Sequence, residues 1–185
     1  MNMTHVFDEI LKHNEAFVAN KEYIPYQTDS NPNKKLAILT CMDSRLTELL
    51  PAALGIKNGD AKIIKNAGGM ITSPVGSTIR SLVVSIYAFD IKQVMIIGHD
   101  HCGMSNVDNS PLIETMKERG ITKEAFETFD SDDFDTARWL EGFANVEESV
   151  AKTVASVVNH PLIAKDVEVR GFVINPSTGE LRPVC

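Results

Sequence analysis

The sequence predicts an α/β domain in which a mainly parallel β-sheet is flanked by helices. Three short apolar runs support this prediction, at residues 36–40, 61–64 and 93–97. Each run is too short for a helix, and continuous apolar character is typical of a parallel strand that is covered on both faces. A helical pattern lies between the second and third runs. Strands that alternate with helices indicate βαβ units and hence a parallel sheet.

The chain begins with a pattern that predicts an amphipathic helix over residues 4–19. Its larger apolar side chains fall on one helical stripe, made up of Phe7, Ile10, Leu11, Phe17 and Val18. Residues 23–33 are polar and contain two prolines, so we expect a loop that leads into the first strand.

The helix after the second strand is expected to begin at Ser73 and Pro74. Serine is a favourable N-cap, and proline is well tolerated at the first helical position. The apolar face of this helix is formed by residues at helical spacing, namely Ile79, Leu82, Val83 and Ile86.

Residues 104–145 are rich in Asp, Glu and Ser, and we expect them to form a surface excursion with short helices, one of them starting at Ser110. Valines at helical spacing predict another helix over residues 145–159. The chain then closes with a strand at 167–174 and a short hairpin that ends near residue 184.

The length of 185 residues predicts a single domain spanning residues 1–185. A domain of this size removes about 70% of its unfolded surface from water, which suffices for one substantial core. Two independent domains would be hard to accommodate in this length.

The charge pattern excludes some classes of partner. The net charge of -7 argues against nucleic acid, because phosphate binding depends on clustered lysine and arginine. No run approaches the roughly 20 apolar residues that cross a bilayer, so we expect no membrane partner. Nor does the acidic start of the chain resemble a secretory signal.

The three cysteines, Cys41, Cys102 and Cys185, are too few and too widely spaced for a disulfide framework. A reducing cytoplasm is therefore the expected location. In that compartment, cysteines near a histidine are more often metal-binding or catalytic than bridged.

Polar motifs follow two of the predicted strands at the point where each strand ends. One is residues 41–45, Cys-Met-Asp-Ser-Arg, and the other is residues 98–103, Gly-His-Asp-His-Cys-Gly. Ligands of open α/β sheets bind beyond the carboxyl ends of the strands. Both motifs are therefore expected at the functional edge of the sheet.

Cys41, His99 and Cys102 are the candidate metal ligands. His99 and Cys102 are three residues apart in an expected turn, and Cys41 comes from another strand end. Two thiolates and one imidazole suit zinc, and three protein ligands leave a fourth tetrahedral position for water or substrate. This donor set is typical of a catalytic zinc rather than a structural one.

The paired motifs resemble the signatures of the β-class carbonic anhydrases, Cys-x-Asp-Ser-Arg followed by His-x-x-Cys-Gly. Residues 64–69, Ile-Lys-Asn-Ala-Gly-Gly, are similar to a further segment of that family. The resemblance runs from about residue 35 to 183 and is weakest over the expected surface excursion. The short length of the chain is similar to that of the compact bacterial branch of the family.

The resemblance implies one Zn²⁺ per chain, bound by Cys41, His99 and Cys102. It also implies that Asp43 and Arg45 form an ion-paired catalytic dyad, and that the Gly103 N–H lies near substrate. The implied reaction is reversible hydration of carbon dioxide to bicarbonate and a proton, through attack by zinc-bound hydroxide. The implied assembly is a homodimer or a dimer of dimers.

Several alternatives remain open at this point. Asp43, released from Arg45, could occupy the fourth zinc position instead. Relatives with the same zinc site hydrolyse carbonyl sulfide or carbon disulfide, and a non-catalytic zinc or redox-sensing protein is a third reading. Three positions also depart from the family pattern: Pro32 replaces a glutamine common in the plant-type branch, Lys65 an arginine and His101 a frequent aspartate.

Overall fold

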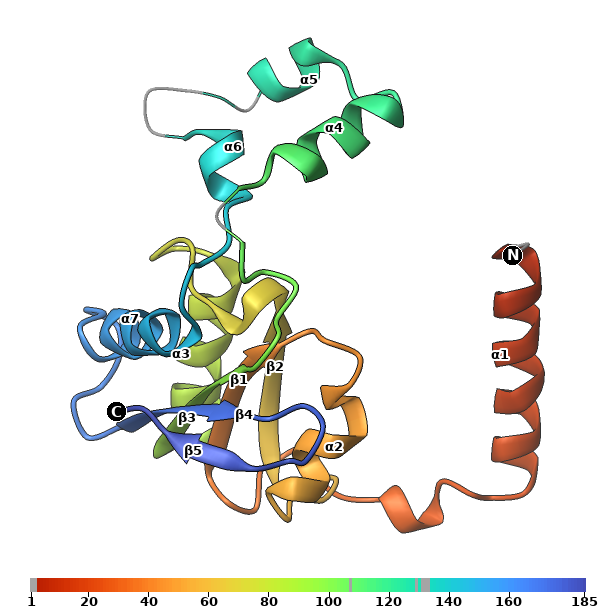
Figure 1. Ribbon diagram of the computed structural model, residues 1–185. Coiled ribbons are helices and arrows are strands. Elements are labelled where there is room, and N and C mark those ends of the chain that lie inside the picture. Colours follow the sequence, from red (N-terminus) through yellow and green to blue (C-terminus); the bar gives the residue numbers. More distant parts are fainter. Residues whose placement is uncertain (1–2, 107, 129, 131–133) are drawn as a thin grey trace.

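The computed structural model describes residues 3–106, 108–128, 130 and 134–185. Its centre is a five-stranded sheet in the order β2-β1-β3-β4-β5 (Figure 1). The first four strands are parallel and β5 is antiparallel to β4, which confirms the predicted α/β class with a mainly parallel sheet. The strands are β1 (Leu36–Cys41), β2 (Ala61–Asn66), β3 (Gln93–His99), β4 (Glu168–Ile174) and β5 (Leu181–Pro183).

Helices lie where most of the helical patterns predict them, with boundaries shifted by a few residues. The α-helices are α1 (Met3–Ala19), α2 (Leu46–Ala53), α3 (Ser77–Phe89), α4 (Ser110–Glu118), α5 (Lys123–Glu127), α6 (Thr136–Trp139) and α7 (Val146–Val158). The described residues also form two 3-10 turns, η1 (Ile24–Tyr26) and η2 (Ala67–Gly69). Helix α2 was not predicted, because it is short and contains Pro51, which removes a helical donor.

The predicted start of the helix after the second strand is wrong. Ser73 does not cap a helix; its hydroxyl accepts a hydrogen bond from the Val75 N–H at 3.3 Å, and its carbonyl accepts one from Gly76 at 3.3 Å. Helix α3 begins only at Ser77. Serine side chains that bond to nearby backbone stabilise turns in competition with a helix, and here the turn prevails.

The two faces of the sheet pack against different helices. Helices α3 and α7 cover one face, where the buried residues include Ala37, Leu39, Leu82, Ile86, Val94, Ile96, Val150 and Val157. Helix α2 covers the other, with Leu36, Ile38, Leu46, Leu50, Ile97 and Ile174. Alternate residues of β1 and β3 therefore enter opposite cores, which explains why these runs are apolar throughout.

The carboxyl ends of β1 and β3 meet at one edge of the sheet. Thr40 lies opposite Ile97 in the parallel register, so Cys41 and His99 end neighbouring strands. Both polar motifs therefore follow adjacent strands at the same edge, as expected.

Two segments lie away from the sheet. Helix α1 stands apart from the sheet and from the helices that cover it, and α4, α5 and α6 gather beyond the sheet edge (Figure 1). Residues 107, 129 and 131–133 of the expected excursion at 104–145 lie outside the described residues. Among the helices that the structure does describe, none is both long and apolar enough to span a membrane.

Candidate metal centre

The three predicted ligands converge in one buried cluster. Cys41 ends β1, His99 ends β3, and Cys102 follows three residues later in a turn. Their exposed fractions are 4%, 1% and 6%. Their candidate ligand atoms all lie within 4.8 Å of one another. The cluster is therefore compact enough for one metal ion to contact all three side chains.

The two sulfur atoms are 3.8 Å apart and both cysteines are free thiols. A disulfide requires sulfur atoms about 2.05 Å apart, so this separation is not that of a covalent bridge. Two sulfurs bound to one tetrahedral ion at about 2.3 Å would be about 3.8 Å apart. The observed spacing thus fits a metal-bridged pair.

His99 presents one ring nitrogen to this cluster. Its Nδ1 lies 2.9 Å from the carbonyl oxygen of Asp100. Because a carbonyl oxygen only accepts, Nδ1 carries the proton and the lone pair lies on Nε2. Nε2 is buried and has no hydrogen-bond partner among the described residues. An unpaired buried acceptor is costly, and a metal ion would satisfy it.

Asp43 and Arg45 form a closely bonded pair beside the cluster. Arg45 Nε donates to Asp43 Oδ1 at 2.9 Å, and Arg45 Nη2 donates to Oδ2 at 2.8 Å. The Arg45 backbone N–H also donates to Oδ1. These bonds hold the pKa of the Asp43 carboxyl well below its usual range. Asp43 Oδ2 lies 3.7 Å from His99 Nε2, so the carboxylate stands at the border of the cluster.

Arg45 also connects the two motifs. Its Nη2 donates to the carbonyl oxygen of His101 at 3.0 Å. His101 has a left-handed backbone with φ of 53°, an uncommon conformation for a non-glycine residue. The His101 side chain is exposed, and it does not belong to the buried ligand cluster.

The two cysteine sulfurs shift each other's pKa in opposite directions. The hydrogen bond with Cys102 lowers the pKa of Cys41, and the same contact raises the pKa of Cys102. Burial lowers the pKa of His99, but the proximity of the Cys41 sulfur and the backbone contact with Asp100 raise it above its ordinary value. A divalent cation bound at this cluster would stabilise both cysteines as thiolates.

A group that the sequence analysis missed lies behind His99. Arg182 on β5 donates to both carboxylate oxygens of Asp100, at 2.9 and 2.7 Å, and to Glu147 Oε1 on α7 at 2.7 Å. Arg182 is 82 residues from Asp100 in the sequence. No local pattern marks Arg182, although Asp100 falls within the predicted metal motif.

Glycines border the cluster on two sides. Gly103 follows Cys102, is exposed, and has open space where a side chain would point. Gly69 lies against the backbone of Thr40 and Cys41. Asn66 holds the intervening segment, since its Oδ1 accepts from the Met70 N–H at 3.0 Å and its Nδ2 donates to the Met70 carbonyl at 2.7 Å.

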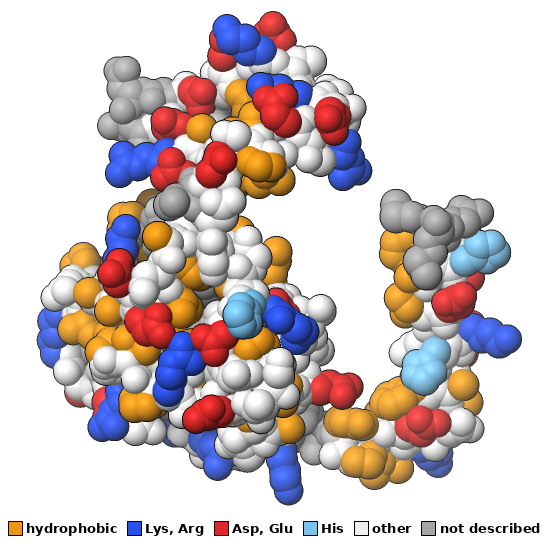
Figure 2. Space-filling view, viewed as in Figure 1, with side chains coloured by type: hydrophobic (Ala, Val, Ile, Leu, Met, Phe, Trp, Pro, Cys, Tyr) orange, Lys and Arg blue, Asp and Glu red, His pale blue; other side chains and the backbone are white. Residues whose placement is uncertain are grey.

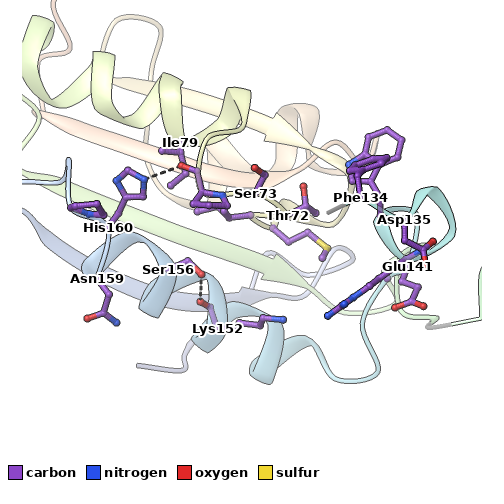
Figure 3. Close-up of a pocket in the computed structure, with 17 residues that line it drawn as sticks. Thr72, Ser73, Ile79, Phe134, Asp135, Glu141, Lys152, Ser156, Asn159 and His160 are labelled. Carbon is purple, nitrogen blue, oxygen red and sulfur yellow. Dashed lines mark hydrogen bonds between the residues drawn. The ribbon is translucent and has the colours of Figure 1, made fainter. Parts of the chain in front are cut away.

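A cavity of about 790 Å³ lies elsewhere, between the segment before α3 and helices α6 and α7 (Figure 3). None of the three candidate ligands lines it. His160 at its wall is fully hydrogen-bonded, because Nε2 donates to the Pro74 carbonyl at 2.9 Å and Nδ1 accepts from the Leu162 N–H at 3.2 Å. His160 therefore has no free ring nitrogen for a ligand.

Comparison with known proteins identifies the family. The carbonic anhydrase family model matches residues 36–181. The chain is 50% identical over 181 residues to "Putative carbonic anhydrase YvdA" of Bacillus subtilis, covering 98% of this chain and 92% of that protein. It is 33% identical over 161 residues to "Carbon disulfide hydrolase" of Acidithiobacillus thiooxidans, covering 82% and 77%. The crystal structure of a Trichomonas vaginalis β-carbonic anhydrase matches with a TM-score of 0.87 at 32% identity and covers 96% of both chains. This chain belongs to the β-carbonic anhydrase family.

Proposed function

We propose that this protein is a zinc enzyme that catalyses reversible hydration of carbon dioxide to bicarbonate and a proton. One observation carries the proposal: two buried thiols 3.8 Å apart face an imidazole nitrogen that has no hydrogen-bond partner among the described residues. Two sulfurs and one nitrogen are a donor set that zinc prefers, and three protein ligands leave a position for water.

Each residue of the two motifs has a proposed role. Cys41, His99 and Cys102 hold one zinc ion, which supplies the nucleophile by making a water molecule acidic. The ionised Asp43 carboxylate accepts a hydrogen bond from the attacking water and orients it. Arg45 keeps that carboxylate ionised and fixed through the forked contact. Gly103 is exposed, and its N–H is the proposed donor to substrate.

Asp43 as a fourth zinc ligand is the alternative resting state. Both of its oxygens are engaged by Arg45 in the structure. Leaving this pair would break three hydrogen bonds, counting the one from the Arg45 backbone. The intact pair therefore favours Asp43 as an orienting group rather than a ligand.

The test measures zinc content and carbon dioxide hydration on the same preparation. We expect about one zinc per chain and rapid hydration in the parent protein. Cys102→Ser removes a thiolate ligand and is expected to lose both zinc and activity. Cys185→Ser alters the exposed cysteine outside the cluster and is the matched control, which should retain both. Near-stoichiometric zinc in Cys102→Ser would remove Cys102 from the ligand set.

Carbon disulfide or carbonyl sulfide hydrolysis is the second candidate function. The 33% identity to a carbon disulfide hydrolase supports it. Sulfide release from both compounds should be assayed beside carbon dioxide hydration. Faster turnover of a sulfur compound would reassign the substrate, and bound zinc without any of these activities would indicate a non-catalytic zinc or redox-sensing role.

The cluster chemistry favours a reducing compartment, and we propose the cytoplasm as the location. Oxidation of Cys41 and Cys102 would consume two of the three metal ligands. The three cysteines are free in the structure.

We further propose that the chain forms a homodimer, or a dimer of dimers, through helix α1. Phe7, Ile10 and Leu11 on this helix are 65%, 59% and 62% exposed. Figure 2 shows hydrophobic side chains along α1, which stands clear of the sheet and its covering helices. A helix with one apolar stripe needs a surface to bury it, and a second copy of the chain supplies one.

Phe7→Lys is expected to weaken this dimer, because a buried aromatic anchor contributes strongly to an interface. Loss of such an anchor weakens association by about 30-fold or more. Ala16→Lys adds the same charge on the opposite side of α1 and is the control. Light scattering after size-exclusion chromatography measures the mass over a range of concentrations. Equal dimer stability in both variants would place the interface elsewhere.

A further inference from the structure

Only two residues, Asp100 and His101, separate the candidate ligands His99 and Cys102. The relative position of the two ligands therefore depends on how these residues are held. Arg45 holds the His101 carbonyl at 3.0 Å. A second arginine, Arg182, holds the Asp100 carboxylate through two bonds. Each residue between the ligands thus contacts a different arginine, and Asp100 is held by the larger number of bonds.

Asp100 is restrained at three points. Its N–H donates to the Ile174 carbonyl at the end of β4, at 3.1 Å. Its two carboxylate oxygens accept hydrogen bonds from Arg182 Nη1 and Nη2 at 2.9 and 2.7 Å. Its carbonyl oxygen accepts the proton from His99 Nδ1 at 2.9 Å. A shift of the side chain would therefore move the carbonyl that fixes the histidine tautomer.

Arg182 is itself well placed to act as an anchor. It lies on β5 opposite Val173 and donates to Glu147 at the start of α7, at 2.7 Å. One guanidinium therefore joins two carboxylates, and this contact lowers the pKa of the Asp100 carboxyl. The Asp100 side chain is 24% exposed and that of Arg182 is 42% exposed, so water reaches the pair only in part.

We propose that Arg182 is a positioning residue for the metal centre. By binding the Asp100 carboxylate, it holds the Asp100 carbonyl against His99 Nδ1, directs Nε2 toward the two cysteines, and sets the spacing of His99 and Cys102. The inference rests on the proposed zinc function. Partners that orient a ligating histidine typically change metal affinity by about 10–100-fold when they are removed.

The direction in which the zinc affinity changes distinguishes a positioning role of Arg182 from a purely electrostatic one. Removing a positive charge near a cation site would, by itself, strengthen binding of the cation. Loss of the contact that positions the ligands would instead weaken binding of the cation. Arg182→Ala is therefore expected to bind Zn²⁺ about 10–100-fold more weakly than the parent protein.

The experiment titrates metal-free protein with Zn²⁺ in competition with a chromophoric chelator, and records the absorption spectrum of the Co²⁺-loaded protein. Arg170→Ala is the matched control, because Arg170 lies on the neighbouring strand β4 and pairs with Glu168 rather than Asp100. We expect parental affinity and an unchanged cobalt spectrum in Arg170→Ala. Arg182→Ala should show weaker binding and an altered spectrum, since the spectrum reports ligand geometry.

Arg182→Lys keeps the charge but cannot reproduce the fork, so it should recover only part of the affinity. If Arg182→Ala does not fold, the lysine variant decides the question, with several-fold weaker binding expected. Asp100→Asn combined with Arg182→Ala should be little worse than either change alone, because both act on one contact.

Zinc affinity within twofold of the parent, together with an unchanged cobalt spectrum, in the folded Arg182 variants would overturn the inference. That result leaves the proposed function intact when the parent binds zinc and hydrates carbon dioxide. A parent protein that binds no zinc would overturn both.

Discussion

Arg45→Ala is expected to keep its zinc and to lose about 100-fold in carbon dioxide hydration. Arg45 fixes both oxygens of Asp43 but is not one of the three clustered ligands. Without the two guanidinium hydrogen bonds, the Asp43 carboxylate can rotate away from the attacking water or toward the ion. Misplacement of an orienting group by about 1 Å commonly costs about 100-fold in rate.

The measurement compares turnover per bound zinc, so that loss of metal is not mistaken for loss of catalysis. Arg45→Lys tests the geometry directly, because lysine keeps the charge but makes a single-point contact. We expect it to remain well below the parent protein. Arg170→Ala again serves as the control for removing an exposed arginine, and should retain full turnover.

Two outcomes would contradict this account of the dyad. A folded, zinc-loaded Arg45→Ala protein with activity within about twofold of the parent would show that Asp43 needs no anchor, since that ratio is only about 0.4 kcal/mol in the barrier. Loss of zinc in parallel with activity would show that Arg45 supports the ligands instead, through its bond to the His101 carbonyl.

The sequence was sufficient to predict that Cys41, His99 and Cys102 come together at one edge of the sheet. Cys41 directly follows the first apolar run, and His99 lies two residues after the third. The carboxyl ends of neighbouring parallel strands lie at one edge of the sheet, so these residues are expected to meet there. The donor types, two thiolates and one imidazole, then favoured a metal that binds sulfur and nitrogen, such as zinc. These are local signals, because each depends on neighbouring residues in the chain.

Contacts between distant segments could not be predicted in this way. Arg182 meets Asp100 only because β5 folds back against β4, and nothing near Arg182 in the sequence marks a carboxylate partner. The start of α3 was misplaced for a related reason. Ser73 has the side chain of a helix cap, but its bonds to the next residues form a turn instead.

The glycine-rich segment after β2 packs closely against the backbone of β1, and Gly69→Ala is expected to be strongly destabilising. Gly69 has φ of +64°, and an added Cβ would lie 2.9 Å from the Cys41 nitrogen and 3.0 Å from the Thr40 carbonyl carbon. Those atoms belong to β1 and cannot move without disturbing the sheet. The positive φ costs about 1–2 kcal/mol and the overpacking about 1–3 kcal/mol more.

Gly55→Ala is the matched control because Gly55 has φ of +63° and nothing within 4 Å of the added Cβ. It should show only the conformational cost, about 1–2 kcal/mol in the free energy of unfolding. Urea unfolding at fixed protein and zinc concentrations measures both variants, since bound zinc and association shift apparent stability. Gly69→Ala should also bind zinc more weakly, because the clash displaces the backbone of Cys41, whereas Gly55→Ala should bind it normally. Equal stability losses and unchanged zinc affinity in both variants would show that the close approach of Gly69 to β1 has no energetic consequence.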